Sequence, residues 1–340
     1  MWNPDLEQIK DIAQGAVRIK KENDGIHFYR FTKEQEEFYR DYGDEFYYSQ
    51  TYATAGVKLS FTTNSTNIYL NISALSASCR NYFSVDIIKD GICIGNIDNY
   101  ADTVFPENYV DVELSLGDFE KKFYLGEGVK EIIIHLPWSA NCIINDIGFD
   151  DNSFIKPLNK GKKLLVYGDS ITQGYDALRP MNRYASKLAH LLGTEEINKA
   201  IGGERFNPAM VSLKDSFTPD IILTAYGTND ISCDGLETTL KNCKGFFGNL
   251  CKNYPNTKIY ALTPIWRGDY KTIDNFEILK NEILNITSSY QNVSVIDGFD
   301  LVPKDKKYFA DLYLHPTDDG FGFYAKNLYD NICKIEEMKE

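Results

Sequence analysis

KKLLVYGDSITQG, residues 162–174, is the stretch from which the second half of the chain can be interpreted. Its apolar run, Leu164–Tyr167, has the length and partly β-branched character of a buried parallel strand, and Gly168 allows a sharp turn where that strand ends. Ser170 then lies at a helix N-terminus, where free backbone N–H groups and the helix dipole favour an anion. Such a serine could attack a carbonyl group, but a strand–G–D–S turn taken alone also fits a serine that only caps the helix.

Strand-like and helical segments alternate from Pro157 onward. The expected strands are Leu164–Tyr167, Glu196–Lys199, Asp220–Ala225, Lys258–Leu262 and Val293–Asp297. Amphipathic stretches between them include Arg183–Leu192, Leu236–Asn253 and Asn275–Tyr290. Five strands with intervening helices predict an α/β domain with a parallel sheet covered on both faces. Functional residues in such sheets collect at the carboxyl ends of the strands.

The first half of the chain has a different pattern, of short strands and turns. The expected strands are Val57–Thr62, Asn67–Ile72, Phe83–Lys89, Ile92–Ile97, Val110–Leu116 and Glu131–Leu136. Asp90-Gly91 between two of them is a strong hairpin signal. Leu6–Ala13 is expected to form a short helix, and Lys33–Tyr42 reads as irregular. We therefore predict an antiparallel β-sandwich over residues 1–152 and the α/β domain over residues 153–340.

Composition limits the partners of the protein. The 340 residues carry a formal charge of −13, so nucleic acid and anionic membranes would be repelled, whereas neutral substrates would not. Seven scattered cysteines, an odd number without a C-x-x-C pair, argue against a disulfide framework or a zinc site. The sequence shows no secretion signal and no apolar run long enough for a membrane helix, so we expect a cytoplasmic location.

Three further patches follow the expected strands or close the domain. Ala200-Ile201-Gly202-Gly203 comes after the second strand, Tyr226-Gly227-Thr228-Asn229-Asp230 after the third, and Ala310–Thr317 contains the only histidine beyond position 190. Paired glycines allow a backbone to approach a ligand closely. The fold would bring all three patches towards Ser170.

Acyl transfer needs a nucleophile, a base, a group that orients the base, and donors aimed at the developing oxyanion. Ser170 supplies a hydroxyl group and His315 a base, and Asp311 is the candidate to fix the imidazole tautomer. The N–H groups of Ser170 and Gly203 and the side-chain amide of Asn229 would form the oxyanion hole. The four patches together favour a nucleophile over a simple helix cap at Ser170.

These blocks resemble those of the SGNH (GDSL-like) hydrolases. Gly168-Asp169-Ser170 is similar to their first block, Gly203 to the second, Gly227–Asp230 to the third, and Asp311 with His315-Pro316 to the last. The resemblance implies a flavodoxin-like three-layer α/β/α domain that needs no metal or other cofactor. A sandwich in front of it is similar to carbohydrate esterases of family 2, which implies an N-terminal jelly roll and deacetylation of glycans or oligosaccharides.

The acid before the histidine departs from the family pattern. SGNH hydrolases usually place it three residues before the histidine, where this chain has Leu312, and Asp311 lies four residues before it. A one-residue bulge could restore the contact. Alternatively a backbone carbonyl, Asp318 or Asp319 orients His315, or the enzyme works with a Ser–His dyad, as members of family 2 can.

Other residues have weaker signals. Trp266 and Arg267 follow the fourth strand and Tyr175 follows Gly174, so we expect these three side chains to contact the acyl group or a sugar ring, with loop packing as the alternative. Trp138 is a further candidate of this kind. Asp169 and Asp230 are expected to brace their turns. Structural roles are expected for His27, His135 and His190, and helix N-terminal positions for Asp318 and Asp319.

The sequence therefore predicts a serine esterase that acts on short acyl esters, above all O-acetyl groups of a small molecule or oligosaccharide. One rival is a lipid or thioester hydrolase with the same catalytic groups. The other is a non-catalytic carbohydrate-binding protein. Acyl-chain preference and covalent labelling of Ser170 would separate the three.

Overall fold

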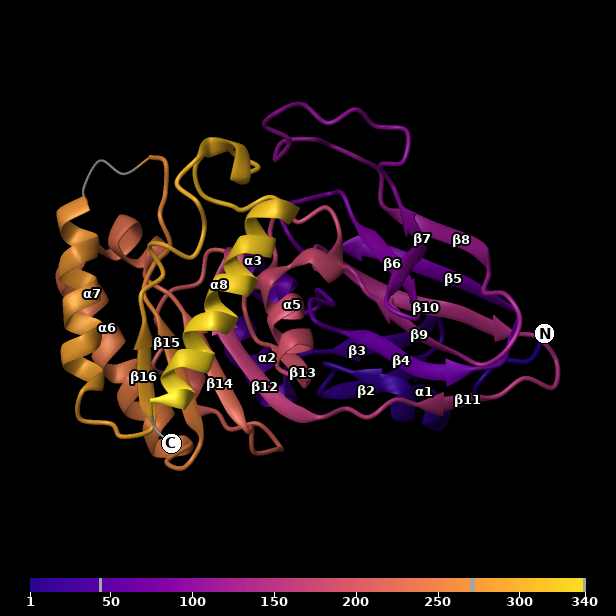
Figure 1. The fold of residues 1–340 in the computed structure, drawn as a ribbon, viewed down its shortest axis with the longest axis horizontal. Helices are drawn as coiled ribbons and strands as arrows, with labels where there is room; N and C mark the ends of the chain where they lie inside the picture. Colours follow the sequence, from indigo (N-terminus) through magenta and orange to yellow (C-terminus); the bar gives the residue numbers. More distant parts are fainter. Residues whose placement is uncertain (43–44, 270–272, 339–340) are drawn as a thin grey trace.

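The computed structural model describes residues 1–42, 45–269 and 273–338, which form two antiparallel sheets followed by a parallel one (Figure 1). Sheet A has the order β2 (Arg18–Glu22), β3 (Gly25–Tyr29), β10 (Ala140–Phe149), β5 (Asn67–Ser76), β8 (Gly117–Tyr124). Sheet B has the order β1 (Ala13–Gln14), β4 (Lys58–Thr63), β9 (Lys130–His135), β6 (Ser84–Lys89), β7 (Ile92–Asp98), and β11 (Ile155–Pro157) pairs with β4.

Sheets A and B share one apolar core. Alternate residues of each strand face it, such as Leu59 and Phe61 of β4 against Leu70 and Ile72 of β5, all fully buried. The first half of the chain is thus built from two antiparallel sheets with a common interior. Its description as a jelly roll stays a prediction.

Several elements of this half differ from the expected ones. Residues 110–116 form no strand, and β8 begins at Gly117 instead. The segment read as irregular is helix α2 (Lys33–Asp41), which Thr32 caps by accepting a hydrogen bond from the Gln35 amide. The other helices here are α1 (Leu6–Ile12) and α3 (Glu45–Gln50). Strands β2, β3 and β10 were also not expected.

Sheet C is parallel and has the order β13 (Thr194–Asn198), β12 (Lys162–Gly168), β14 (Ile221–Ala225), β15 (Lys258–Leu262), β16 (Val293–Ile296). All five expected strands are present, and the order 2-1-3-4-5 is that of flavodoxin-like folds. The α-helices here are α4 (Ser170–Gln173), α5 (Tyr184–Leu191), α6 (Thr228–Asn253), α7 (Ile273–Thr287) and α8 (Asp318–Glu337). Single 3₁₀ turns are η1 (Pro180–Asn182), η2 (Met210–Ser212) and η3 (Lys306–Tyr308). Asp318 and Asp319 open α8, as expected.

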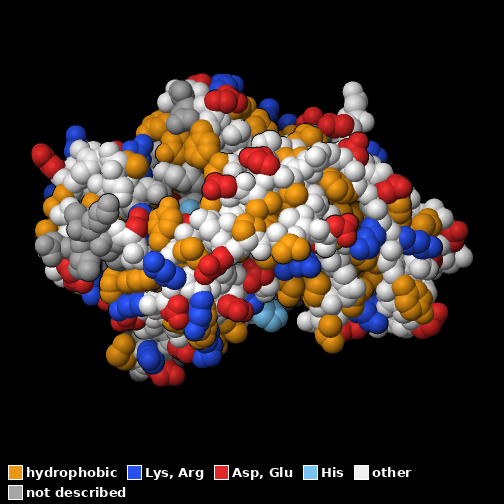
Figure 2. Space-filling model, turned by 90° about the horizontal axis from the view of Figure 1, so that it is seen from above, with side chains coloured by type: hydrophobic (Ala, Val, Ile, Leu, Met, Phe, Trp, Pro, Cys, Tyr) orange, Lys and Arg blue, Asp and Glu red, His pale blue; other side chains and the backbone are white. Residues whose placement is uncertain are grey.

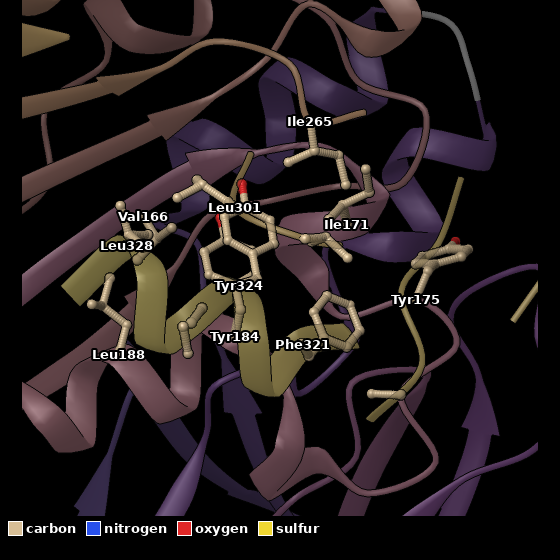
Figure 3. Packing of buried hydrophobic residues seen from close by; sticks show 14 of the residues in the cluster. Val166, Ile171, Tyr175, Tyr184, Leu188, Ile265, Leu301, Phe321, Tyr324 and Leu328 are labelled. Atoms are coloured by element: carbon tan, nitrogen blue, oxygen red, sulfur yellow. The ribbon is translucent and has the colours of Figure 1, made fainter. Parts of the chain in front are cut away.

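Helices cover both faces of sheet C. α5 and α8 pack on one face, where the rings of Tyr184 and Tyr324 stack with centroids 4.0 Å apart (Figure 3). α6 and α7 cover the other face, through residues such as Phe246 and Leu279. The predicted three-layer α/β arrangement with a five-stranded parallel sheet is therefore confirmed.

The two halves of the chain share a strand pair and part of an apolar core. β11 lies beyond the boundary predicted at 152/153 and still pairs with β4. Phe31 and Tyr39, from the first half, belong to the apolar cluster under sheet C. The predicted second domain also includes residues 270–272 and 339–340, which lie outside the described part of the chain.

The surface shows no concentration of one charge on the face seen in Figure 2, where acidic and basic side chains are interspersed. Among the described residues, no helix is long and apolar enough to cross a membrane.

Candidate active site

Ser170 opens helix α4 directly after strand β12. Asp169 caps this helix by accepting a hydrogen bond from the Ile171 N–H (3.0 Å), so it braces the turn as expected. A Cβ atom at Gly168 would lie 2.3 Å from Thr172 Oγ1, and this crowding explains why the turn needs glycine. Ser170 is 7% exposed.

The side chains of Ser170, His315 and Asp311 form a hydrogen-bonded chain. Ser170 Oγ lies 2.9 Å from His315 Nε2, and His315 Nδ1 lies 2.8 Å from Asp311 Oδ2. A carboxylate can only accept here, so Asp311 favours the tautomer in which His315 carries its proton on Nδ1. In this tautomer Nε2 is free to accept the proton of the Ser170 hydroxyl group. The structure thus brings together the three residues that the sequence suggested as nucleophile, base and orienting acid.

A bulge brings Asp311 to the histidine. Leu312 has φ = 67°, a left-handed conformation, and this local turn absorbs the extra residue between acid and base. The Oδ1 atom of Asp311 accepts hydrogen bonds from the N–H groups of Tyr313 (3.0 Å), Leu314 (2.6 Å) and His315 (3.1 Å). Burial opposes ionisation, but the hydrogen bonds from His315 and the backbone outweigh it and lower the pKa of Asp311.

Asp176 is a second carboxylate beside the histidine, and no motif in the sequence pointed to it. Its Oδ2 atom lies 3.3 Å from His315 Nδ1. The guanidinium group of Arg80 donates to both oxygens, with Nε 2.6 Å from Oδ1 and Nη2 3.1 Å from Oδ2. Tyr82 also donates to Oδ1, and Tyr109 donates to the Asp176 carbonyl (2.7 Å). Three residues of the first half thus hold an acid at the candidate base.

Asp318 and Asp319 were the other candidates for orienting the base. Asp318 Oδ1 accepts the Leu178 N–H (2.9 Å) and its Oδ2 accepts the Asn182 side-chain amide (2.7 Å). The carboxylate of Asp318, at the start of α8, is thus bound to the segment before α5. It makes no contact with His315 among the described interactions. The described contacts thus favour Asp311 as the orienting acid, with Asp176, which was not among the expected candidates, as a second carboxylate at the same ring nitrogen.

The candidate oxyanion donors follow neighbouring strands. Gly203 has φ = 81°, which only glycine adopts without strain, and the Ile201 N–H joins its loop to the Gly168 carbonyl (3.2 Å). The adjacent Gly202 N–H is already bound by Gln50 Oε1 (2.9 Å) and by a second glutamine. Gly203 is the glycine of this pair whose N–H has no acceptor among the described residues.

Asn229 lies in the first turn of α6. Its Nδ2 atom donates to the Glu204 carbonyl (3.1 Å), which leaves one amide hydrogen for a substrate. Asp230 accepts the N–H groups of Phe206 (2.8 Å) and Gly227 (2.9 Å), so it braces this loop as expected. Neighbouring strands β12, β13 and β14 thus each deliver one of the proposed donors to the same sheet edge.

Glu204, beside this loop, is buried between two tyrosines. Tyr39 donates to Oε1, and Tyr226 to Oε2 (3.3 Å). Burial raises the pKa of Glu204 to about 8, above the ordinary value of 4.5. Between these two pH values the folded chain keeps this carboxyl group protonated, whereas the unfolded chain releases the proton.

Glu204→Gln should therefore make the protein more stable at alkaline pH. A carboxyl group with a raised pKa contributes its full stability below about pH 4.5, and that contribution is lost as the pH rises through about 8. We expect a melting temperature roughly 3 °C or more above wild type at about pH 8.5, and a much smaller difference near pH 5. Thermal melts at both pH values measure this, with the exposed Glu237→Gln as control. An equal shift at both pH values would contradict the protonated state of Glu204.

The three candidate substrate contacts have different environments. Trp266 is partly buried and packs on Phe309, with ring centroids 5.4 Å apart. Arg267 pairs with Asp269 (2.7 Å) and donates to the Thr228 carbonyl (3.2 Å). Their contact with substrate stays a prediction.

Tyr175 is enclosed rather than presented to solvent. It is 2% exposed, its hydroxyl donates to Gln50 Oε1 (2.8 Å), and its ring stacks on that of His315 with centroids 5.8 Å apart. The Trp138 ring also packs against the Tyr175 ring, with ring centroids 4.9 Å apart. In this arrangement Tyr175 contacts the candidate base and has little surface left for a substrate.

A serine hydrogen-bonded to a histidine at the carboxyl edge of a flavodoxin-like sheet defines a serine-hydrolase type of site. Residues 166–322 match the model of the GDSL-like Lipase/Acylhydrolase family. The resemblance to SGNH (GDSL-like) hydrolases is thus confirmed, and the protein is a carboxylic ester hydrolase. A comparison with curated protein sequences finds no match.

Solved structures with the same fold include proteins of different activity. The salicylyl-acyltransferase SsfX3 of a tetracycline biosynthetic pathway has a TM-score of 0.76 and 17% identity, covering 95% of this chain and 94% of that one. A family two carbohydrate esterase from Cellvibrio japonicus has a TM-score of 0.67 and 16% identity, covering 98% of each chain. A family two carbohydrate esterase from Clostridium thermocellum, in complex with cellohexaose, has a TM-score of 0.64 and 14% identity, covering 84% of this chain and 94% of that one.

Proposed function

We propose that this hydrolase is an esterase that removes short acyl groups, above all O-acetyl groups, from carbohydrates. The observation that carries the proposal is the unbroken chain from Ser170 Oγ through the His315 ring to Asp311, with atoms 2.9 and 2.8 Å apart. The low exposure of Ser170 favours a small acyl group. The structural likeness to family two carbohydrate esterases over nearly the whole chain supports a sugar as the alcohol.

The reaction would follow from the positions of these groups. Ser170 Oγ attacks the ester carbonyl while His315 Nε2 takes its proton, and the ionised Asp311 stabilises the resulting imidazolium. Asp176 would add a second negative charge at Nδ1. The oxyanion would receive hydrogen bonds from Ser170 N–H, Gly203 N–H and the Asn229 amide. His315 then protonates the leaving alcohol, and water releases the acid from the acyl-enzyme by the same steps.

Acetate release from acetylated xylan, acetylated mannan and simple sugar acetates is the direct test. We expect release from at least one of these substrates, together with turnover of p-nitrophenyl acetate that exceeds turnover of a long-chain p-nitrophenyl ester. A preference for the long chain without acetate release would favour the lipid hydrolase. Binding of a glycan without any turnover would favour the carbohydrate-binding protein.

Asn229→Ala should lower kcat by about 100-fold or more, because the variant loses a hydrogen bond to the oxyanion, whose charge develops only in the transition state. KM should change little. Since Asn229 also holds the Glu204 carbonyl, a melting curve must accompany the kinetics. A variant that is folded and keeps wild-type kcat would remove Asn229 from the oxyanion hole.

All seven cysteines are free in the structure, a state that suits a reducing compartment. A cytoplasmic location stays a prediction.

A further inference from the structure

A pocket lies away from Ser170, between the outer face of sheet B and helices α5 and α8. Its volume is about 360 Å³, at the lower end of the range for small-molecule sites. β4 and β9 form one wall, where Lys58 and His135 are cross-strand neighbours. α5 forms the opposite wall, with Lys187 and His190. We call it the lysine pocket, after Lys58 and Lys187.

The charge of the lysine pocket is opposite to that of the whole protein. No aspartate or glutamate is among its lining residues, although the chain carries a net charge of −13. A third lysine at its rim, Lys326, is paired with Asp330 (2.5 Å). Lys58 and Lys187 have neither a carboxylate partner nor a hydrogen-bond acceptor within the described part of the chain. Two uncompensated ammonium groups therefore face one cavity.

Of the two lysines, Lys58 loses more hydration free energy, because it is the more deeply buried. It is partly buried, and desolvation lowers its pKa, although Glu196 and Glu195 attract it from a distance. Glu196 is already bound by Arg183 at 3.0 Å, and Glu195 accepts the Gly15 N–H at 2.9 Å. A half-buried ammonium without a partner is unfavourable, and an anion placed beside it would recover that free energy.

His135 adds a hydrogen-bond donor to the lysine pocket rather than a charge. Burial lowers the pKa of His135 well below its ordinary value, and Lys58, Arg183 and His190 act in the same direction. His135 is therefore neutral at physiological pH and can donate one N–H. Every ionisable group that acts on His135 is a cation when charged.

The remaining lining is apolar. Ile88 and Ile133 point outwards from sheet B, away from the sandwich core, and Met181, Leu191 and Ala325 face them from the other half. Leu191 is 41% exposed, an unusual position for a large aliphatic side chain unless something covers it. Cationic and apolar groups thus line one small cavity.

We propose that the lysine pocket binds a small organic anion, with its carboxylate or phosphate head between Lys58 and Lys187 and its apolar part against Ile133 and Leu191. The site is separate from the proposed esterase site and needs none of its residues. The ligand would bridge the two halves of the chain, because Lys58 belongs to sheet B and Lys187 to α5.

Isothermal titration calorimetry with hexanoate, hexyl phosphate, hexanol and inorganic phosphate tests the proposal. We expect hexanoate or hexyl phosphate to bind at least about tenfold more tightly than hexanol and than inorganic phosphate, since each of the latter lacks one half of the recognition. The stronger of the two amphipathic anions identifies the head group. Ser170→Ala should bind these anions with the same affinity as wild type. A changed affinity would indicate that the anions bind at the proposed esterase site instead.

Charge-removing variants locate the ligand. Lys58→Met with Lys187→Met should weaken binding at least about tenfold, and Lys187→Met alone, on the surface of α5, several-fold. The matched control is Lys244→Met with Lys252→Met, two exposed lysines of α6, which should leave binding unchanged. The proposal fails if neither amphipathic anion binds, or if the folded Lys187→Met variant and the folded double variant bind as tightly as wild type.

Discussion

Ser170→Ala is expected to lower kcat on p-nitrophenyl acetate at least about 10⁴-fold. The substitution removes the attacking oxygen, and the remaining groups can only orient water and stabilise the oxyanion, which leaves a small residual rate. The melting temperature should change little, because Ser170 Oγ makes no hydrogen bond other than that to His315 among the described contacts.

Two further measurements support this expectation. A fluorophosphonate should label wild type at one residue and should not label Ser170→Ala. Ser289→Ala, at an exposed serine in the turn after α7, is the matched control and should keep full activity. Unchanged turnover by folded Ser170→Ala would refute the nucleophile assignment.

The second large effect is expected from the two carboxylates at His315 Nδ1. Asp311→Asn should lower kcat about 100-fold or more, because an amide can present its NH₂ group to Nδ1 and favour the wrong tautomer. Asp176→Asn should cost about tenfold, since its carboxylate is further away, at 3.3 Å, and is paired with Arg80. The double variant should lose about 10⁴-fold, more than the product of the single losses, because no acceptor remains for Nδ1–H.

Kinetics of the four proteins over a range of pH test this prediction. Loss of negative charge beside the imidazole should lower the apparent pKa of the rising limb of kcat/KM in each variant, and a merely structural defect would not move it. Strict multiplication of the two single effects would show that Asp176 does not substitute for Asp311.

The sequence predicted the parts of the fold that depend on local pattern. The five strands of sheet C are continuous apolar runs, and runs of that kind are recognisable without knowledge of their partners. The GDS turn, the paired glycines and the H-P motif each follow such a strand or close the domain. Since parallel strands share one carboxyl edge, their order was enough to bring Ser170, Asn229 and His315 towards one another.

Features that depend on distant contacts were not predictable in this way. Asp176 matters because Arg80 reaches it across 96 positions of sequence, and neither residue has a motif of its own. α2 read as irregular because its polar residues are stabilised by tertiary contacts, such as that of Tyr39 with Glu204. The region 110–116 is apolar enough for a strand, but Tyr109, just before it, is bound to the catalytic half instead.

The link from Arg80, Tyr82 and Tyr109 to Asp176 has a consequence for the redesign of this protein. Arg80, Tyr82 and Tyr109 lie before the predicted boundary, whereas Asp176 lies after it. Recombination at the boundary predicted at 152/153 would therefore remove the partners of Asp176 and change the surroundings of His315, even though every residue of the SGNH blocks stayed in place. Exchange of the first half alone would thus be a change to the candidate active site as well.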